Sequence, residues 1–225
     1  MGKIGKRLLT CVKLCKGDFV ADIGTDHGYL PCYMVQNGLC SGAFACDIAP
    51  KPLESAEKNI ALQGLDDKIQ TILTNGLENV PCDKITDIVI AGMGGEMIVS
   101  ILEGCSWIKR KPVNLVLQPM TKWDFLRRWL YENGFAVTNE LACVEGRFVY
   151  SVMQTAYCEA PLPYQCDLSY LYFGRVSAET DDGREYIKRQ CMRLEKEGRG
   201  LANVPEKMAL AEEMIELAEN TLKKN

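Results

Sequence analysis

Short apolar runs alternate with amphipathic stretches from Phe19 to Tyr157 of this 225-residue chain. The apolar runs have the length of buried strands, and the stretches between them repeat apolar residues at helical spacing. The predicted strands are Phe19–Ile23, Gly42–Cys46, Ile69–Leu73, Asp87–Ala91 and Asn114–Gln118. The predicted helices are 30–37, 51–62, 96–102 and 122–133. This alternation predicts an α/β fold, a parallel-dominated sheet with helices on both faces. Two further strands, 137–143 and 147–154, are expected to pair at its end.

The composition changes after Tyr157, where Pro161 and Pro163 indicate a linker. A short helix at 168–173, capped by Asp167, and a long charged helical region follow. In that region apolar or small residues recur at steps of three and four. They are Ile187, Cys191, Leu194, Gly198, Leu201, Val204, Met208, Ala211, Ile215, Ala218 and Leu222.

Gly198-Arg-Gly200 and Pro205 are expected to divide this region into two helices. The pattern predicts a C-terminal helical hairpin with a coiled-coil-like seam, and pairing with helices of another molecule is the alternative. We therefore predict two domains, residues 1–158 and residues 159–225, and favour a monomer.

Composition limits the function classes. The content of hydrophobic residues, 47%, is enough for a full core, and no apolar stretch approaches the roughly 18 residues of a membrane span. We expect no export signal, no membrane association and a cytoplasmic location. Eleven cysteines without a Cys-x-x-Cys pair, together with a single histidine, predict reduced thiols and no metal site. The net charge of −4 argues against indiscriminate nucleic-acid binding but allows a local basic face.

The first predicted strand ends in a turn that contains Gly24 and Gly28 and passes into a helix. Such a turn places backbone N–H groups beside a ligand at the carboxyl end of the sheet. The Gly-x-Gly-x-x-Gly pattern of dinucleotide-binding proteins is absent, which disfavours an NAD-dependent oxidoreductase. Asp22 and Asp26 would repel a diphosphate but suit the cationic amino-acid end of S-adenosylmethionine. An ordinary strand-to-helix turn is the alternative.

Polar residues also follow the second and third predicted strands. Asp47 could accept hydrogen bonds from both ribose hydroxyls of an adenosyl group, although a lone Asp at this position is often a helix cap. Asn75-Gly76 follows the third predicted strand, where enzymes that bind S-adenosylmethionine commonly hold the adenine. A plain turn is the alternative.

The fourth predicted strand is followed by Ala91-Gly-Met-Gly-Gly95. Three glycines in four positions indicate close backbone approach or positive φ angles. We interpret this segment as an open loop, poor in side chains, that forms the floor of a pocket for a target base. A purely structural turn is the alternative.

Five segments together resemble the TrmK family of bacterial tRNA (adenine-N1)-methyltransferases, which act on position 22 of the tRNA. They are 22–31, 46–48, 75–77, 92–95 and 117–119. The first also resembles the Asp/Glu-x-Gly-x-Gly-x-Gly motif of class I methyltransferases, with Asp26 in place of the middle glycine. The resemblance implies a Rossmann-like catalytic domain, a coiled-coil tail, S-adenosylmethionine as cofactor and tRNA as substrate.

The predicted site combines the residue patterns with this resemblance. The predicted cofactor-binding residues are Arg7, Asp22, Gly24, Asp26, Gly28, Tyr29, Asp47, Ile48, Asn75, Gly76, Ala91 and Gly92. Met93, Gly94 and Gly95 are expected to contact the base. Arg7 matches a basic position of the family's N-terminal helix and could bind the cofactor carboxylate; a solvated surface residue is the alternative.

Asp26 and His27 are the predicted catalytic residues. Adenine N1 carries a lone pair and no proton, so alignment with the methyl donor matters more than base catalysis. The Asp26 carboxylate would stabilise the cationic product, and His27 would hydrogen-bond the base or handle a proton. A structural histidine is the alternative. The glycines at 92–95 replace the Asn/Asp-Pro-Pro-Tyr/Phe motif of N6-adenine enzymes, which disfavours methylation at N6.

Basic residues concentrate away from the centre of the predicted fold: Lys109–Lys111, Lys122, Arg127–Arg128 and, on the first tail helix, Lys188, Arg189, Arg193, Lys196 and Arg199. The tail residues recur at helical intervals, and we predict that Lys188, Arg189, Arg193 and Lys196 contact tRNA phosphates. Solvated faces are the alternative. Two other functions stay open: methylation of a different RNA, protein or small molecule, and a non-catalytic RNA-binding module.

Overall fold

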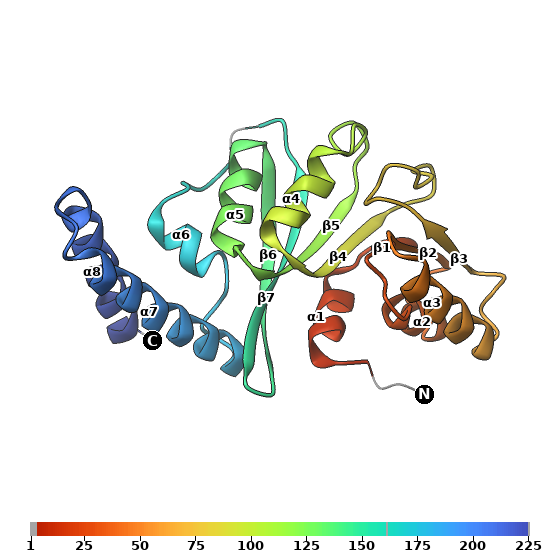
Figure 1. Cartoon of the computed structure of the whole chain (residues 1–225), viewed down its shortest axis with the longest axis horizontal. Helices are drawn as coiled ribbons and strands as arrows, with labels where there is room; N and C mark the ends of the chain where they lie inside the picture. Colours follow the sequence, from red (N-terminus) through yellow and green to blue (C-terminus); the bar gives the residue numbers. More distant parts are fainter. Residues whose placement is uncertain (1–3, 161, 225) are drawn as a thin grey trace.

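The computed structural model describes residues 4–160 and 162–224, so the predicted linker residue Pro161 lies outside the described residues. A seven-stranded sheet with the order β3-β2-β1-β4-β5-β7-β6 forms its centre (Figure 1). The strands are β1 (Phe19–Ile23), β2 (Gly42–Asp47), β3 (Ile69–Leu73), β4 (Asp87–Gly94), β5 (Asn114–Thr121), β6 (Phe135–Glu145) and β7 (Phe148–Tyr157). Strands β1 to β5 are parallel, and β6 and β7 form an antiparallel pair. The predicted parallel-dominated sheet and its terminal strand pair are confirmed.

Five helices cover the two faces of the sheet. Side chains of successive strand residues point to opposite faces, so Val20 packs with α1, α2 and α3, whereas Ala21 packs with α4 and α5. These helices are α1 (Lys6–Leu14), α2 (Tyr29–Gln36), α3 (Pro50–Leu62), α4 (Gly95–Glu103) and α5 (Trp123–Glu132). No helix in the described part of the chain is long and apolar enough to cross a membrane.

The order of the strands creates a crevice at one edge of the sheet. The chain runs outward from β1 to β2 and β3 and then returns to place β4 on the other side of β1. The helices that follow β1 and β4 therefore leave from the same edge toward opposite faces, and the carboxyl ends of these strands border a gap. Ligands of open α/β sheets bind at such switch points.

Strand β4 corrects the prediction of an open loop after Ala91. The strand continues to Gly94, and Met93 and Gly94 pair with Pro119 and Thr121 of β5. The register shifts between Ala91 and Met93 and again between Met93 and Gly94, and Gly92 has a φ of 84°. The glycines thus allow a bulged strand rather than a loop, because a bulge with positive φ favours glycine.

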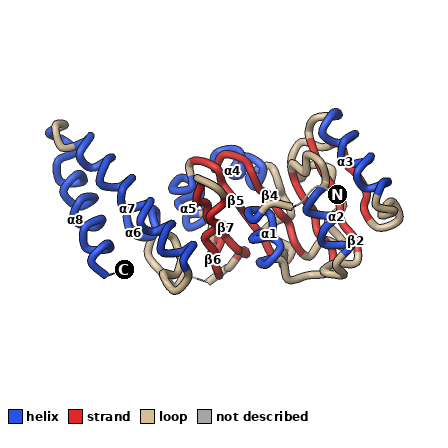
Figure 2. Tube along the Cα trace, turned by 90° about the horizontal axis from the view of Figure 1, so that it is seen from below, coloured by secondary structure: helices blue, strands red, loops and turns tan. Residues whose placement is uncertain are grey.

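The tail comprises α6 (Leu168–Phe173), α7 (Asp181–Leu201), the 3-10 turn η1 (Pro205–Lys207) and α8 (Met208–Lys224). The Asp167 carboxylate accepts a hydrogen bond from the backbone N–H of Tyr170 at 2.8 Å, so the predicted cap of α6 is confirmed. Helix α8 runs back along α7 (Figures 1 and 2).

The predicted helix break at Gly198–Gly200 is wrong. Both glycines lie inside α7, and the chain turns between Leu201 and Pro205 instead. A Cβ on Gly198 would stand 2.9 Å from Ile215 Cγ1 and 3.0 Å from the Ala211 carbonyl oxygen, both in α8. The missing side chain lets the two helices approach closely, and this packing offsets the cost of about 1 kcal/mol for glycine in a helix.

A buried ion pair joins the tail to the sheet, and it corrects the prediction that Arg127 belongs to a basic surface. Arg127 in α5 has no exposed side-chain area, and its Nη2 donates to Glu140 Oε1 of β6 at 2.6 Å. Nη1 donates to the Leu171 carbonyl of α6 at 2.7 Å, and Nη2 also donates to the Tyr186 hydroxyl of α7 at 2.9 Å. The division at residues 158/159 stays a prediction, because the tail helices share a hydrophobic cluster with side chains of β6 and β7.

Candidate functional site

A cavity of about 450 Å³ opens at the carboxyl ends of β1, β2, β3 and β4, at the switch point of the sheet. Most of the predicted cofactor residues converge on it. The lining residues are Ile23, Gly24, Asp26, Asp47, Ile48, Thr74, Asn75, Gly76, Ala91, Gly92, Met93, Met97 and Ile101. Ile23, Thr74, Met97 and Ile101 were not predicted, because an apolar or hydroxyl side chain in these patterns carries no signal of its own. Arg7, Asp22, His27, Gly28, Tyr29, Gly94 and Gly95 lie outside this lining.

The turn after β1 owes its shape to three residues with positive φ angles: Gly24 at 74°, Asp26 at 53° and Gly28 at 68°. Asp26 therefore adopts the left-handed conformation, which Asp tolerates better than most residues. A Cβ on Gly28 would stand 3.3 Å from Ala56 Cβ, so this glycine brings α3 close to the turn. The backbone N–H of Asp26 donates to Asp47 Oδ2 at 3.3 Å, which ties the turn to β2.

Asp22 lies beneath this turn rather than in the cavity. Its side chain is buried, and its Oδ2 accepts a hydrogen bond from Thr25 Oγ1 at 2.7 Å. Burial raises the pKa of Asp22 to about 6, while the Thr25 hydrogen bond and the positive charge of Arg7 oppose this rise. A negative charge on Asp22 would thus act on a cationic ligand through the turn, without lining the cavity.

Asp26 lines the cavity, and His27 lies beside it outside the lining. Asp26 Oδ2 lies 3.6 Å from His27 Nε2, with 69% and 47% of the two side chains exposed. The His27 carbonyl accepts a hydrogen bond from Asn59 Nδ2 at 3.0 Å, and the His27 ring lies 5.3 Å from the Tyr29 ring. The predicted pair is therefore adjacent, held by α3 and accessible to a substrate.

Asp47 and Asn75 end two neighbouring strands of the cavity. Asp47 Oδ1 accepts a hydrogen bond from the backbone N–H of Ala49 at 3.0 Å, so Asp47 shapes the turn into α3 as well as facing the cavity. Asn75 Nδ2 donates to Glu78 Oε1 at 2.7 Å, and Gly76 has a φ of 58°. Asp47 is not the cap of α3, whose N-cap residue is Ala49, whereas the turn weighed for Asn75-Gly76 is present; both Asp47 and Asn75 line the cavity.

Gln118 is a residue of this site to which the sequence analysis gave no role. It is fully buried, and its Oε1 accepts hydrogen bonds from Arg7 Nη1 at 2.6 Å and from the backbone N–H of Gly92 at 3.1 Å. Its Nε2 donates to the Pro119 carbonyl at 2.9 Å, which fixes the orientation of the amide. Gln118 thus holds the α1 arginine against the wall of the cavity. The segment 117–119 carried the resemblance, but its pattern gave no sign of this contact.

The three residues predicted to contact a base differ in their surroundings. A Cβ on Gly24 would collide with Met93 Cε, so the Met93 side chain occupies the space above the turn. The expectation of a floor poor in side chains is therefore wrong at this position. A Cβ on Gly95 would collide with the Lys122 carbonyl, and one on Gly94 would stand 3.2 Å from Thr121 Oγ1. The structure thus gives Gly94 and Gly95 a packing role against the end of β5.

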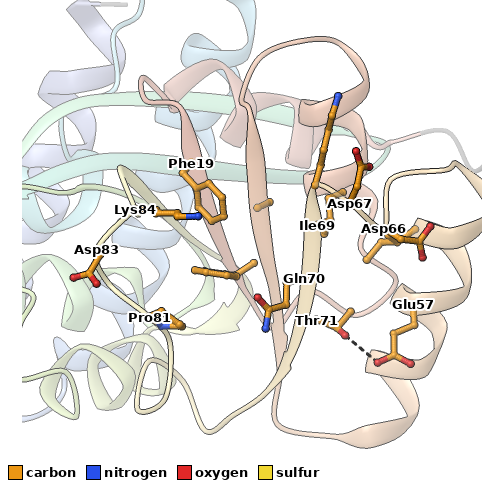
Figure 3. Close-up of a pocket in the computed structure, with 14 residues that line it drawn as sticks. Phe19, Glu57, Asp66, Asp67, Ile69, Gln70, Thr71, Pro81, Asp83 and Lys84 are labelled. Atoms are coloured by element: carbon orange, nitrogen blue, oxygen red, sulfur yellow. Dashed lines mark hydrogen bonds between the residues drawn. The ribbon is translucent and has the colours of Figure 1, made fainter.

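A second hollow of about 760 Å³ lies at the opposite edge of the sheet, near the amino ends of β1, β2 and β3 (Figure 3). Acidic and basic side chains both line it, and Thr71 donates to Glu57 at 2.9 Å at its border. No residue of the predicted site lies there. Within the described residues, no group of three His, Cys, Asp or Glu side chains is arranged to hold a metal ion, and the cysteines form no disulfide.

The fold and the site define a class. A switch-point cavity with acidic residues at the ends of β1 and β2, apolar walls and no diphosphate fingerprint is typical of a Rossmann-like class I methyltransferase. The comparison with known sequences agrees: residues 4–153 match the methyltransferase domain family. The chain belongs to this family.

Individual relatives show which methyltransferases this chain is similar to. The Bacillus subtilis tRNA (adenine(22)-N(1))-methyltransferase is 38% identical over 152 residues, which are 67% of this chain and 64% of that enzyme. The chain thus spans somewhat less than two thirds of the length of this curated relative. A candidate tRNA (m1A22) methyltransferase of Streptococcus pneumoniae, solved with S-adenosyl-L-methionine, is 30% identical with a TM-score of 0.78, covering 98% of this chain and 100% of that chain. Mycoplasma capricolum TrmK, solved with S-adenosyl-homocysteine, is 26% identical with a TM-score of 0.79, covering 98% of both chains.

Proposed function

We propose that this chain transfers the methyl group of S-adenosylmethionine to N1 of adenine 22 in tRNA. The observation that carries the proposal is the convergence of Asp26, Asp47, Asn75 and Gly92 on one switch-point cavity. The likeness to the Bacillus subtilis enzyme supports the choice of substrate and position. On this proposal the protein acts in the cytoplasm, where tRNA is found, and acts as a monomer.

The residues present fit the cofactor. Asp47, Ile48, Asn75 and Gly76 line the cavity together; on this proposal Asp47 would accept hydrogen bonds from the ribose hydroxyls and the other three would contact the adenine. Arg7 is placed to bind the carboxylate with the guanidinium donors that Gln118 leaves free. When bound, S-adenosylmethionine supplies an electrophilic methyl group on a positively charged sulfur.

The protein contributes alignment and charge. Because neutral adenine N1 carries a lone pair and no proton, holding it in line with the methyl group can supply several kcal/mol. Methyl transfer makes the adenine cationic, and the accessible carboxylate of Asp26 at the mouth of the cavity would stabilise that charge. His27, 3.6 Å from Asp26, is placed to hydrogen-bond the base edge.

The basic face of α7 is proposed to bind tRNA phosphates. Lys188, Arg189, Arg193 and Lys196 are all exposed. Arg189 also pairs with Glu185 at 2.7 Å, and the Arg193 guanidinium lies 5.4 Å from the centre of the Trp123 ring. Trp123 begins α5 directly after the carboxyl end of β5, so Arg193 connects the basic face to the edge of the sheet that carries the cavity.

The test is to map the modified position by mass spectrometry after incubation with S-adenosylmethionine and tRNA that lacks N1-methyladenosine. We expect N1-methyladenosine at position 22. Modification at another nucleotide would redirect the proposal to a different RNA site, and an unmodified RNA would remove tRNA as the substrate. Asp26→Ala should lower turnover by well over tenfold, which is more than about 1.4 kcal/mol of barrier, with S-adenosylhomocysteine binding retained.

The proposed tRNA contact has its own test. Arg189→Gln, Arg193→Gln and Lys196→Gln together should weaken tRNA binding and reduce its dependence on salt concentration. The matched control is Lys51→Gln, Lys58→Gln and Lys68→Gln around α3, which removes the same charge elsewhere. A salt dependence equal to that of the control would make the basic face of α7 a solvated surface only.

A further inference from the structure

The hairpin of β6 and β7 projects beyond the edge of the sheet that carries the cavity (Figure 1). Leu117 of β5 pairs with Met153, and β7 begins five residues earlier, at Phe148. The pairing of β5 with β7 stops at Leu117 and Met153, whereas β6 and β7 stay paired up to Glu145 and Phe148. The tip of the hairpin therefore has no neighbouring strand on the β5 side.

Three side chains form a stack at this tip. The Arg147 guanidinium lies 4.9 Å from the centre of the Phe148 ring. The Phe148 and Tyr150 rings are stacked, with centres 6.2 Å apart and an interplanar angle of 25°. Residues 148 and 150 share one face of the strand because side chains alternate along it. Phe148 is 51% exposed, so a preformed arrangement of a cation and flat rings faces solvent.

The tip lies close to elements of the proposed site. Glu145 Oε1 accepts a hydrogen bond from the backbone N–H of Arg7 at 3.3 Å, so α1 begins against the hairpin. Lys6 pairs with Asp182 at 2.7 Å, which places the start of α7 beside the start of α1. The stack thus lies on the face of β7 that packs with α1, which carries Arg7, whereas Val149 on the opposite face packs with the tail helices.

We propose that Arg147, Phe148 and Tyr150 form a stacking platform for an unpaired base of the RNA substrate. The proposal rests on the proposed function and deepens it. An aromatic ring accepts any base through its π-face, and an adjacent arginine adds charge and a cation–π contribution. Single-stranded and splayed bases of RNA are bound in this way, whereas paired bases keep their faces stacked inside the helix. The platform would hold RNA at the edge where its target base must leave the stack.

The experiment compares Phe148→Ala and Phe148→Trp with Leu62→Ala, a control that removes an 86% exposed side chain on α3. Binding of unmodified tRNA is measured by fluorescence anisotropy, and binding of S-adenosylhomocysteine by calorimetry. Phe148→Ala should weaken tRNA binding about tenfold, Phe148→Trp should retain it, and neither should change S-adenosylhomocysteine binding. Leu62→Ala should bind tRNA as the wild type does.

Two results would overturn the platform: tRNA binding by Phe148→Ala within twofold of the wild type, or equal loss of tRNA and S-adenosylhomocysteine binding, which indicates a structural role. Arg147→Gln checks the cation separately and should weaken tRNA binding several-fold; no change would exclude the arginine from the platform. Failure of the proposed function is distinguishable, because it shows as wild-type protein that leaves tRNA unmethylated.

Discussion

Arg7 and Arg127 show two ways in which one kind of side chain is used in this molecule. Arg7 is half-buried at the cavity edge and donates to the amide oxygen of Gln118. Arg127 is fully buried and donates to groups on β6, α6 and α7. The first guanidinium is oriented but keeps donors for a ligand. The second has its two terminal nitrogens engaged in joining the tail to the sheet.

The difference predicts different consequences for stability and binding. A fully buried ion pair is costly to break, because removal of one partner leaves an uncompensated charge in the interior. A half-exposed arginine beside a neutral amide contributes little to the free energy of unfolding. Its main effect should be on the affinity for the ligand that it binds. Variants of each arginine and its neighbours test this contrast.

Arg127→Ala should lower the free energy of unfolding by about 3–5 kcal/mol, because Glu140 stays buried without its cation. Urea unfolding at neutral pH measures this. Arg127→Met combined with Glu140→Met removes both charges and should recover most of the loss. A loss below about 1 kcal/mol for Arg127→Ala would show that the joint tolerates an unpaired carboxylate.

Asp22, beside Arg7, should make the unfolding free energy depend on pH. Its pKa of about 6 in the folded protein lies above the value near 3.9 of an unfolded chain, so the folded protein holds the proton more tightly. This contribution to stability is full below about pH 4 and is lost as pH rises through 6. The difference in unfolding free energy between wild type and Asp22→Asn should therefore shift by roughly 2 kcal/mol between pH 4 and 7. Parallel stability curves for the two proteins would contradict the raised pKa.

Arg7→Ala should weaken S-adenosylhomocysteine binding about tenfold, or about 1.4 kcal/mol, since the cofactor carboxylate loses its cation. Its unfolding free energy should change by less than about 1 kcal/mol, in contrast to Arg127→Ala. Calorimetry and urea unfolding measure the two quantities. Arg7→Lys keeps the charge without the planar fork and should bind with intermediate affinity. Unchanged affinity in Arg7→Ala would show that this arginine does not bind the cofactor carboxylate.

Gln118→Met should produce the smallest effect on affinity, about threefold, because Arg7 loses the acceptor that orients it but keeps its charge. The control is the double variant with Arg7→Ala, which should bind S-adenosylhomocysteine no more weakly than Arg7→Ala alone. Additive losses in this cycle would mean that Gln118 acts independently of Arg7, through its contact with Gly92.

The sequence patterns predicted the strands and turns whose formation depends on residues close together in the chain. Strands β1 and β3 begin and end at the predicted residues, because each is a short apolar run in a parallel sheet. The turn after β1 was predicted as a cofactor turn, because its glycines place backbone N–H groups beside a ligand and its aspartates suit a cationic one. Asp26, Asp47, Asn75 and Gly92 were each predicted near the carboxyl end of a strand, and the parallel strands bring these ends together at the cavity.

Features that depend on distant partners were missed. Arg127 was assigned to a surface because the sequence does not show that Glu140 and Tyr186 enclose it. Gly198 was taken as a helix break because its value lies in contact with α8, 13 to 17 residues later in the chain. The Met93 side chain fills space above Gly24 through a bulge in β4 that residue types alone do not reveal.

The buried contacts of Arg127 attach α6 and α7 to the sheet, which favours a fixed position of the tail over free motion. On the proposed function, the fold would then fix the distance between the basic face of α7 and the methyl donor. An RNA gripped by its backbone would offer for methylation only the nucleotide that lies at that span, so selection would follow length and shape. Inserting or deleting one base pair in the gripped stem would move the modified position or abolish it.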